Sequence, residues 1–204
     1  MVKRGLRILA LALACGLAGN AAAQPYEVVE PTYDTPQPAQ GGAPAPFALG
    51  DMLSAGHQVF GDFTQSFAAI VEHAVSRYGL PNGYIVGEEA GGALIGGARY
   101  GEGTLYTRNA GTYRIFWQGP SLGLDVGANG NRVMMMVYNL PSVAAMYDRY
   151  IGVNGSAYVV AGLGMTVLSR SGIYVVPVVS GVGARLGFNL GYLKFTSKRT
   201  WNPF

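Results

Sequence analysis

The C-terminal part of this chain consists of short runs of strand-forming residues separated by turns, and this pattern constrains the fold more than any other feature. Runs rich in β-branched, aromatic and other large apolar residues occupy 113–117, 133–138 and 173–176. Turn-forming pairs such as Asn129-Gly130 and Asn154-Gly155 lie between them. A series of short strands with regular turns is typical of an all-β barrel or sandwich.

Glycine placement favours the barrel. In the expected strands 121–127 and 181–194, one face is rich in glycine and the other carries large apolar side chains. Glycine inside a strand marks a tight bend or a close approach of backbones, and a narrow closed sheet needs both. We therefore predict a mainly β fold built on a small antiparallel β-barrel. The pattern does not decide which face points inward; if the glycine-rich faces do, Asp125 and Arg185 are expected to form an ion pair inside the barrel.

Apolar residues recur at helical spacing between Asp62 and Tyr78, which predicts an amphipathic helix before the strands. A capping box begins this helix, and Gly79 ends it. Its polar face carries a single base, so packing against the core is favoured over binding to a membrane surface. A weaker helical turn is expected near 53–59, and a short second helix over 141–150.

The first residues have the order of a secretory signal peptide. Three basic residues precede an uninterrupted apolar run over 8–18, and small residues at 21–23 provide a cleavage site after Ala23. The apolar run is too short to span a bilayer, which takes about 20 helical residues. A lipoprotein acylated at Cys15 is the alternative, but Ala12-Leu13-Ala14 before it fits that signal poorly. We therefore expect export out of the cytoplasm and removal of residues 1–23.

The proline-rich segment 24–47 is expected to be a disordered linker, followed by a folded domain over 48–204. The signal peptide carries three of the fourteen basic residues and none of the eleven acidic ones, so the rest of the chain is neutral. A neutral chain argues against a nucleic-acid partner. Because Cys15 is the only cysteine, cleavage leaves no disulfide, zinc thiolate site or cysteine nucleophile.

One motif resembles that of an enzyme. The sequence Gly119-Pro120-Ser121-Leu122-Gly123 matches the nucleophile motif of serine hydrolases, which requires a following helix and a later histidine. Here a glycine-alternating strand follows, and both histidines, His57 and His73, come earlier. We therefore expect no enzyme, keep a hydrolase using Ser121 as a minor alternative, and interpret Gly119-Pro120 as a turn between strands. Two histidines are too few for a metal site, and no cofactor is expected.

A binding interior is the remaining candidate for function. Tyr113 and Trp117 share one face of an expected strand, and Arg114 lies on the other. A cavity lined by aromatic side chains and an occasional base suits a lipid or another amphiphile, so the candidate ligand-binding residues are Tyr113, Arg114, Trp117 and Arg185. The simpler interpretation, that these aromatic residues form an ordinary core, is favoured over it.

The chain from Pro81 onward resembles the envelope integrity protein A family of Gram-negative periplasmic proteins. The resemblance is carried by residues 87–93, 100–106, 117–123, 155–160 and 191–204. It implies a small conical antiparallel β-barrel in the periplasm with accompanying helices, a role in maintaining the cell envelope, and no enzymatic activity. The glycine-rich strands and the Trp117–Pro120 segment are more distantly similar to lipid-binding SYLF domains.

Together these features predict a non-enzymatic periplasmic protein that supports envelope integrity by binding a lipid, an envelope glycan or a protein partner; peripheral contact with a membrane is compatible with them. An integral outer-membrane β-barrel is the alternative, because such barrels often end in an aromatic residue like Phe204. Asn202 and Pro203 interrupt the alternation of such a final strand, however, and the strands lack a continuous lipid-facing apolar band. The ligand and the oligomeric state stay open.

Overall fold

The computed structural model describes residues 43–61, 64–92, 97–120, 131–180 and 191–202, and every structural statement below concerns these residues. They belong to one unit, residues 36–204. The elements are α1 (Leu49–Phe60), α2 (Thr64–Tyr78), β1 (Gly83–Gly92), β2 (Ala98–Thr107), β3 (Gly111–Pro120), β4 (Asn131–Tyr138), the 3-10 helix η3 (Val143–Met146), β5 (Arg149–Gly152), β6 (Tyr158–Val160), β7 (Leu163–Met165), β8 (Leu168–Arg170), β9 (Ile173–Ser180) and β10 (Tyr192–Thr196). None of the described helices is long and apolar enough to cross a membrane.

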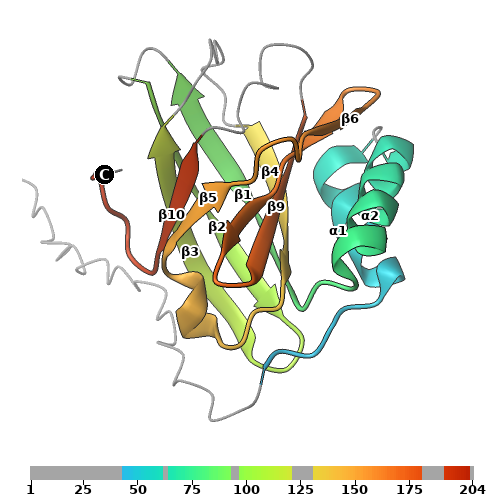
Figure 1. Ribbon diagram of the computed structural model, residues 1–204, viewed down its shortest axis with the longest axis horizontal. Helices are drawn as coiled ribbons and strands as arrows, with labels where there is room; N and C mark the ends of the chain where they lie inside the picture. The colour runs from blue at the N-terminus through green and yellow to red at the C-terminus, as the bar shows by residue number, and fades with distance from the viewer. Residues whose placement is uncertain (1–42, 62–63, 93–96, 121–130, 181–190, 203–204) are drawn as a thin grey trace, which may run out of the picture. The chain divides into compact units, whose positions relative to one another are not determined.

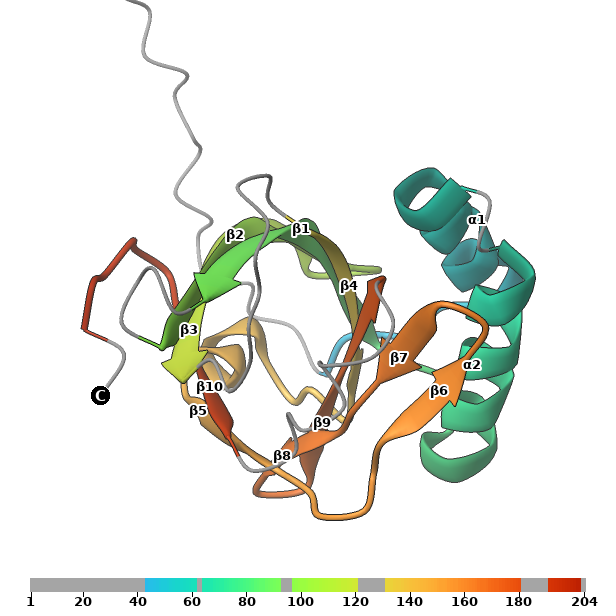
Figure 2. The same cartoon turned by 90° about the horizontal axis from the view of Figure 1, so that it is seen from above.

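Eight of the described strands form a closed antiparallel ring. The order around the ring is β4-β1-β2-β3-β10-β5-β8-β9, and pairing of β9 with β4 closes it. Figure 2 shows this ring from above. The β-barrel predicted from the short strands and their turns is therefore confirmed.

The hairpin of β6 and β7 leaves the ring and reaches the helices. β7 and β8 follow each other along the same edge of β9, where β8 pairs with its first residues and β7 with Val178–Ser180. β5 continues the ring beside β8, whereas β6 pairs with β7. Both strands of the hairpin contact α2, and the two helices lie on this side of the barrel (Figure 1).

Two apolar cores share one wall of the barrel. The inner core comprises Ile85, Leu105, Tyr113, Ile115, Trp117, Val133, Met135, Val137, Leu140, Met146, Tyr150, Leu168, Ile173, Val175, Leu193 and Phe195. The outer core comprises Met52, Val59, Phe60, Phe67, Ile70, Val71, Ala74, Met134, Met136, Tyr138, Leu163, Met165, Val167, Val176 and Val178. β4 contributes to both, because its side chains alternate between the inside of the barrel and the helices.

The amphipathic stripe of α2 therefore packs against protein. Phe67, Ile70 and Val71 on α2 are fully buried in the outer core. This confirms the core-packing interpretation for the described part of the stripe. The helix ends at Tyr78, and Gly79 adopts a left-handed backbone with φ 77°, as the sequence predicts.

Inward-facing glycines allow neighbouring strands to approach closely. Gly87 on β1 lies opposite Gly103 on β2, and a Cβ atom added to Gly87 would lie 2.2 Å from the carbonyl oxygen of Glu102. Such a contact is shorter than any van der Waals approach, so a side chain there would push the two strands apart. The glycine-alternating segments 121–127 and 181–190, on which the barrel was predicted, lie outside the described residues, but β1 and β2 use glycine as that prediction expects.

Gly119 and Pro120 do not form the predicted turn. They are the last two residues of β3 and pair with Arg99 and Ala98 of β2. A Cβ atom at Gly119 would lie 2.1 Å from the carbonyl oxygen of Tyr192, so this glycine admits a neighbouring backbone within the sheet. Proline is tolerated at the end of the strand because its missing N–H interrupts the ladder least there.

The structure corrects two of the helical predictions and leaves a third untested. Residues 141–150 form only the 3-10 turn η3, because Arg149 and Tyr150 belong to β5 and the Tyr150 hydroxyl donates to the carbonyl of Ala145 at 2.8 Å. α1 is longer than the predicted turn over 53–59. Residues 62–63, with the predicted cap of α2, lie outside the described part.

The last residues of the expected linker contact the folded domain. The backbone N–H of Ala45 donates to the side chain of Asn109, and that of Phe47 donates to the carbonyl of Pro81. The Phe47 ring also packs edge-on against Tyr84, with ring centres 5.0 Å apart. These contacts connect the segment before α1 to the barrel wall.

Candidate functional site

The predicted ligand-binding residues are divided between two faces of the barrel wall. Tyr113 and Trp117 point into the inner core and are 8% and 1% exposed. Arg114 lies on the outer face of β3 and pairs with Glu102. Arg185, and with it the predicted pair of Asp125 and Arg185, lies outside the described residues. Ligand binding at these residues stays a prediction.

A polar group inside the barrel was missed by the sequence predictions. The indole N–H of Trp117 donates to Glu89 Oε2 at 2.7 Å, and Arg99 Nη1 lies 3.8 Å from Glu89 Oε1. The Glu89 and Arg99 side chains are only 13% and 15% exposed. The adjacent glutamates at 88 and 89 carried a usable signal, because side chains alternate along a strand and one of the two must face inward.

The residue between Glu89 and Trp117 makes this contact possible. Gly101 pairs with Glu89 on one side and with Trp117 on the other, so the three residues form a row across β1, β2 and β3. Because Gly101 has no side chain, the Trp117 indole lies across it and reaches the carboxylate on β1. A Cβ atom at Gly101 would lie 2.1 Å from the indole.

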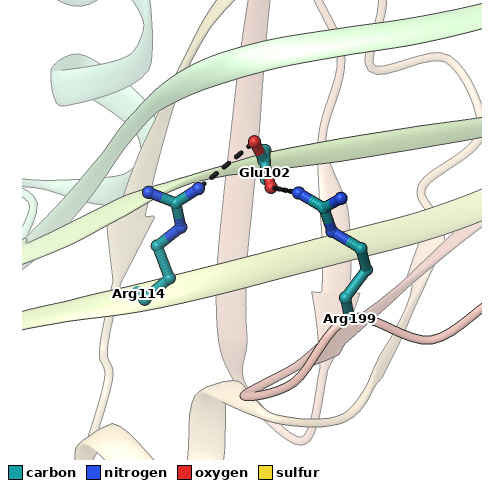
Figure 3. A network of polar contacts seen from close by, with 3 residues as sticks. All are labelled: Glu102, Arg114 and Arg199. Atoms are coloured by element: carbon teal, nitrogen blue, oxygen red, sulfur yellow. Dashed lines mark hydrogen bonds and ion pairs between the residues drawn. The ribbon is translucent and has the colours of Figure 1, made fainter. Parts of the chain in front are cut away.

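On the outside of the same strands lies the C-terminal tail, residues 197–202. Glu102 on β2 accepts from Arg114 at 3.2 Å and also pairs with Arg199 of the tail (Figure 3). The hydrogen bond from Arg199 lowers the pKa of Glu102, and the Arg114 guanidinium adds to this effect. Both guanidinium groups lie over the ring of Phe116, 5.6 and 5.8 Å from its centre.

The tail and the outer face of β1, β2 and β3 enclose a groove, which we call the tail groove. Its volume is about 220 Å³, and it is lined by Glu88, Glu89, Ala90, Tyr100, Gly101, Glu102, Phe116, Trp117, Gln118, Arg199, Thr200 and Trp201. The Trp201 ring centre lies 5.3 Å from that of Tyr100, whose hydroxyl donates to the Trp201 carbonyl at 3.1 Å. Trp201 is nevertheless 72% exposed.

Gln118 is the most unusual residue of the tail groove. It is 1% exposed, and its Oε1 lies 3.4 Å from the Thr200 hydroxyl. Its amide Nε2 is buried without a hydrogen-bond partner among the described residues. Buried amides in folded proteins are nearly always paired, so this donor calls for an acceptor.

Two further hollows border other parts of the wall. One, of about 490 Å³, lies beside the tail and is lined by Tyr147, Asp148, Arg149, Lys194, Phe195, Thr196, Ser197, Lys198 and Thr200. The other, of about 480 Å³, lies between α1 and the outer face of β1 and β2, where the Tyr84 and Tyr106 rings stack at 4.8 Å. Burial raises the pKa of Tyr84, and the neighbouring Tyr106 adds to this rise.

Both histidines lie on the helices, His57 on α1 and His73 on α2. His57 Nδ1 lies 2.7 Å from the Thr64 hydroxyl, and the His73 ring stacks on Tyr158 at 4.1 Å. Ser121, the serine of the hydrolase-like motif, lies outside the described residues. Within the described ranges, no group of three or more His, Cys, Asp or Glu side chains could hold a metal ion.

The pairing of Glu102 with Arg199 predicts a pH-dependent tail. A carboxylate whose pKa is lowered by folding stabilises the folded state above its unfolded pKa of about 4.5, and this contribution is lost as the pH falls through the lowered value. We expect the indole N–H signal of Trp201 to shift in NMR spectra as the pH falls below about 4.5. In Glu102→Gln the Trp201 signal should no longer respond over this range; an unchanged pH response would contradict the assigned pairing.

Comparison with known proteins assigns the fold to a family. A model of the family described as envelope integrity protein A matches residues 46–204, which include both helices and every described strand. A solved crystal structure, that of a beta-barrel-like, uncharacterized protein from Brucella abortus, is 55% identical; the match covers 78% of this chain and 99% of that chain, with a TM-score of 0.72. No curated protein matches this chain.

Proposed function

Because this chain belongs to the envelope integrity protein A family, we propose that it supports the cell envelope from the periplasm, without catalysing a reaction, by holding an envelope component on its outer surface. Family membership carries the envelope role. The signal-like N-terminus, with its basic start, apolar run and cleavage site after Ala23, supports the periplasmic location.

The packing of the barrel favours binding on the outside. Large side chains such as Trp117, Tyr150 and Phe195 fill the described interior and are almost completely buried. An apolar ligand inside would have to displace them, at the cost of their mutual contacts. The tail groove, in contrast, is already open and combines exposed aromatic surface with polar groups.

The outer surface also favours a periplasmic protein over an integral outer-membrane barrel. A membrane barrel needs an apolar band facing lipid all around the wall. Here α1 and α2 cover the apolar outer face of β4 and β9, and Glu102 and Arg114 lie on the outer face of β2 and β3. A lipid-facing role would require the helices to detach and would bring these charges into hydrocarbon.

Fractionation of the parent bacterium tests the location. We expect osmotic shock to release the protein with an N-terminus at Gln24, because cleavage after Ala23 removes the apolar run. A chain lacking residues 1–23 serves as the control and should stay in the cytoplasm. Recovery solely from detergent-extracted outer membrane would contradict the proposal.

Deletion of the gene tests the envelope role. The deletion strain should become more sensitive to detergents and to cell-wall antibiotics, and the exported chain should restore resistance. The chain lacking residues 1–23 should not restore it. If this cytoplasmic form restored resistance, the protein would not need to be in the periplasm to support the envelope, and the proposal would be overturned.

A further inference from the structure

We propose that the tail groove binds a sugar ring of an envelope glycan, with Trp201 as the stacking platform and Gln118 as a buried hydrogen-bond donor. This inference rests on the proposed function and names the ligand class for it. It is carried by three observations: an exposed aromatic ring held in place, an orphaned buried amide, and the charge of the groove lining.

The first observation concerns Trp201. An indole that is 72% exposed leaves a large apolar surface in water. Tyr100 nevertheless holds Trp201 in place, because the two rings are in contact and the Tyr100 hydroxyl donates to the Trp201 carbonyl. The face of an aromatic ring carries partial negative charge and attracts the polarised C–H groups that line one face of a sugar. A flat aromatic surface held in this way at the mouth of a groove is suited to stacking against a pyranose ring.

The second observation concerns Gln118. Its Nε2 is buried and finds no hydrogen-bond partner in the described part of the chain, although the residue lines the groove and its Oε1 lies beside the Thr200 hydroxyl. A buried donor without a partner destabilises the protein, and an acceptor supplied by a ligand removes that cost. Sugar hydroxyl and acetamido oxygens are acceptors of this kind.

The third observation separates a sugar from a phospholipid headgroup. The groove lining includes the carboxylates of Glu88 and Glu102 and the guanidinium of Arg199, which pairs with Glu102. Glu89 also belongs to the lining, but its carboxylate is bonded to Trp117 inside the barrel. This lining offers an anionic phosphate no excess of positive charge, whereas sugar hydroxyls can donate to the carboxylates and accept from the guanidinium. The volume of about 220 Å³ is below the roughly 300 Å³ at which drug-sized pockets begin, so the groove has room for one ring and not for an acyl chain.

Calorimetric titration with chitotetraose, a soluble oligomer of N-acetylglucosamine, tests the inference on protein purified from the periplasm. We expect saturable binding by the wild type and at least a tenfold weaker affinity in Trp201→Ala. Ile151→Ala is the matched control, because Ile151 is 64% exposed and does not line the groove. Its affinity should equal that of the wild type.

Gln118→Met distinguishes a binding role from a structural one. Methionine is similar in shape and removes the unpaired donor, so the melting temperature should stay the same or rise. The affinity for chitotetraose should nevertheless fall several-fold. A variant that loses stability but keeps its affinity would overturn the role assigned to Gln118.

Co-sedimentation with purified peptidoglycan sacculi and with phosphatidylglycerol vesicles completes the test. Sedimentation with sacculi that is lost in Trp201→Ala supports the inference. It is overturned if neither chitotetraose nor sacculi bind to the folded protein, if Trp201→Ala binds like the wild type, or if vesicles bind through Trp201 instead. In each of these cases a positive fractionation and rescue result would leave the proposed envelope function standing.

Discussion

In a Gly101→Ala variant, the free energy of unfolding is expected to fall by about 3 kcal/mol, the upper part of the range for overpacked cores. The added Cβ atom would lie 2.1 Å from the Trp117 indole. The indole cannot move aside easily, because it is 1% exposed and bonded to Glu89 across the very residue that is changed. Urea unfolding followed by circular dichroism measures the loss.

Gly50→Ala provides the matched control for this experiment. Gly50 lies in α1, and a Cβ atom there would have no neighbour within 4 Å. Alanine in a helix interior is more stable than glycine by about 0.5–1 kcal/mol, so this variant, in the first turn of α1, should gain a smaller amount of stability. The same chemical change is thus expected to act in opposite directions at the two sites.

A double variant tests whether contact with the Trp117 indole causes the loss of stability in Gly101→Ala. In Gly101→Ala with Trp117→Phe, the smaller ring leaves room for the new methyl group. The two substitutions should therefore cost less together than the sum of their separate costs, with a coupling of about 1 kcal/mol or more. A Gly101→Ala protein that unfolds at the wild-type urea concentration would contradict the row of Glu89, Gly101 and Trp117 across the wall.

This row illustrates how far sequence reasoning reaches in a small barrel. The alternation of glycine with large residues predicted close approaches inside a curved sheet, because glycine in a strand has few other uses. Which face pointed inward depended on strand register, and a register involves partners far away in the chain. The pairing of Glu89 with Arg99 needed the same register and was missed for the same reason.

The tail groove was harder to predict from the sequence than this row of residues. Its lining comes from three strands and from a tail that follows β10, and Glu102 contacts Arg199 ninety-seven residues away. No local periodicity encodes such a contact. The aromatic and charged residues concerned were visible individually, but Tyr113 and Trp117 were chosen as ligand-binding candidates because strand alternation grouped them, and these two lie in the filled interior.

β4 shows the opposite case, in which a local sequence pattern has a clear physical origin. Residues 133–138 are apolar without alternation, although most half-exposed strands alternate. The structure explains this by burial on both faces: Met135 and Val137 face the interior, while Met134 and Met136 face the helices. The continuous run was thus a sign that the predicted helix covers this strand.

Phe67→Ala tests whether the helix layer and the barrel form one cooperative unit. Phe67 is fully buried, its ring lies 5.3 Å from that of Phe60, and a Cβ atom at Gly56 would lie 1.9 Å from it. Removing such a ring should lower the free energy of unfolding by about 3–5 kcal/mol. Urea unfolding measures this cost, with the exposed Glu72→Ala on the same helix as a control expected within about 0.5 kcal/mol of the wild type.

The same variant links the helices to the proposed location of the protein. If α1 and α2 loosen, the apolar outer face of β4 and β9 becomes accessible, and the dye ANS should fluoresce more strongly with Phe67→Ala than with Glu72→Ala. A large contiguous apolar surface on a barrel attracts membranes and other proteins. The helices would then be what keeps this wall of the barrel away from lipid. A Phe67→Ala protein whose free energy of unfolding falls by less than about 1 kcal/mol, and which binds no ANS, would show that the wall does not depend on the helices.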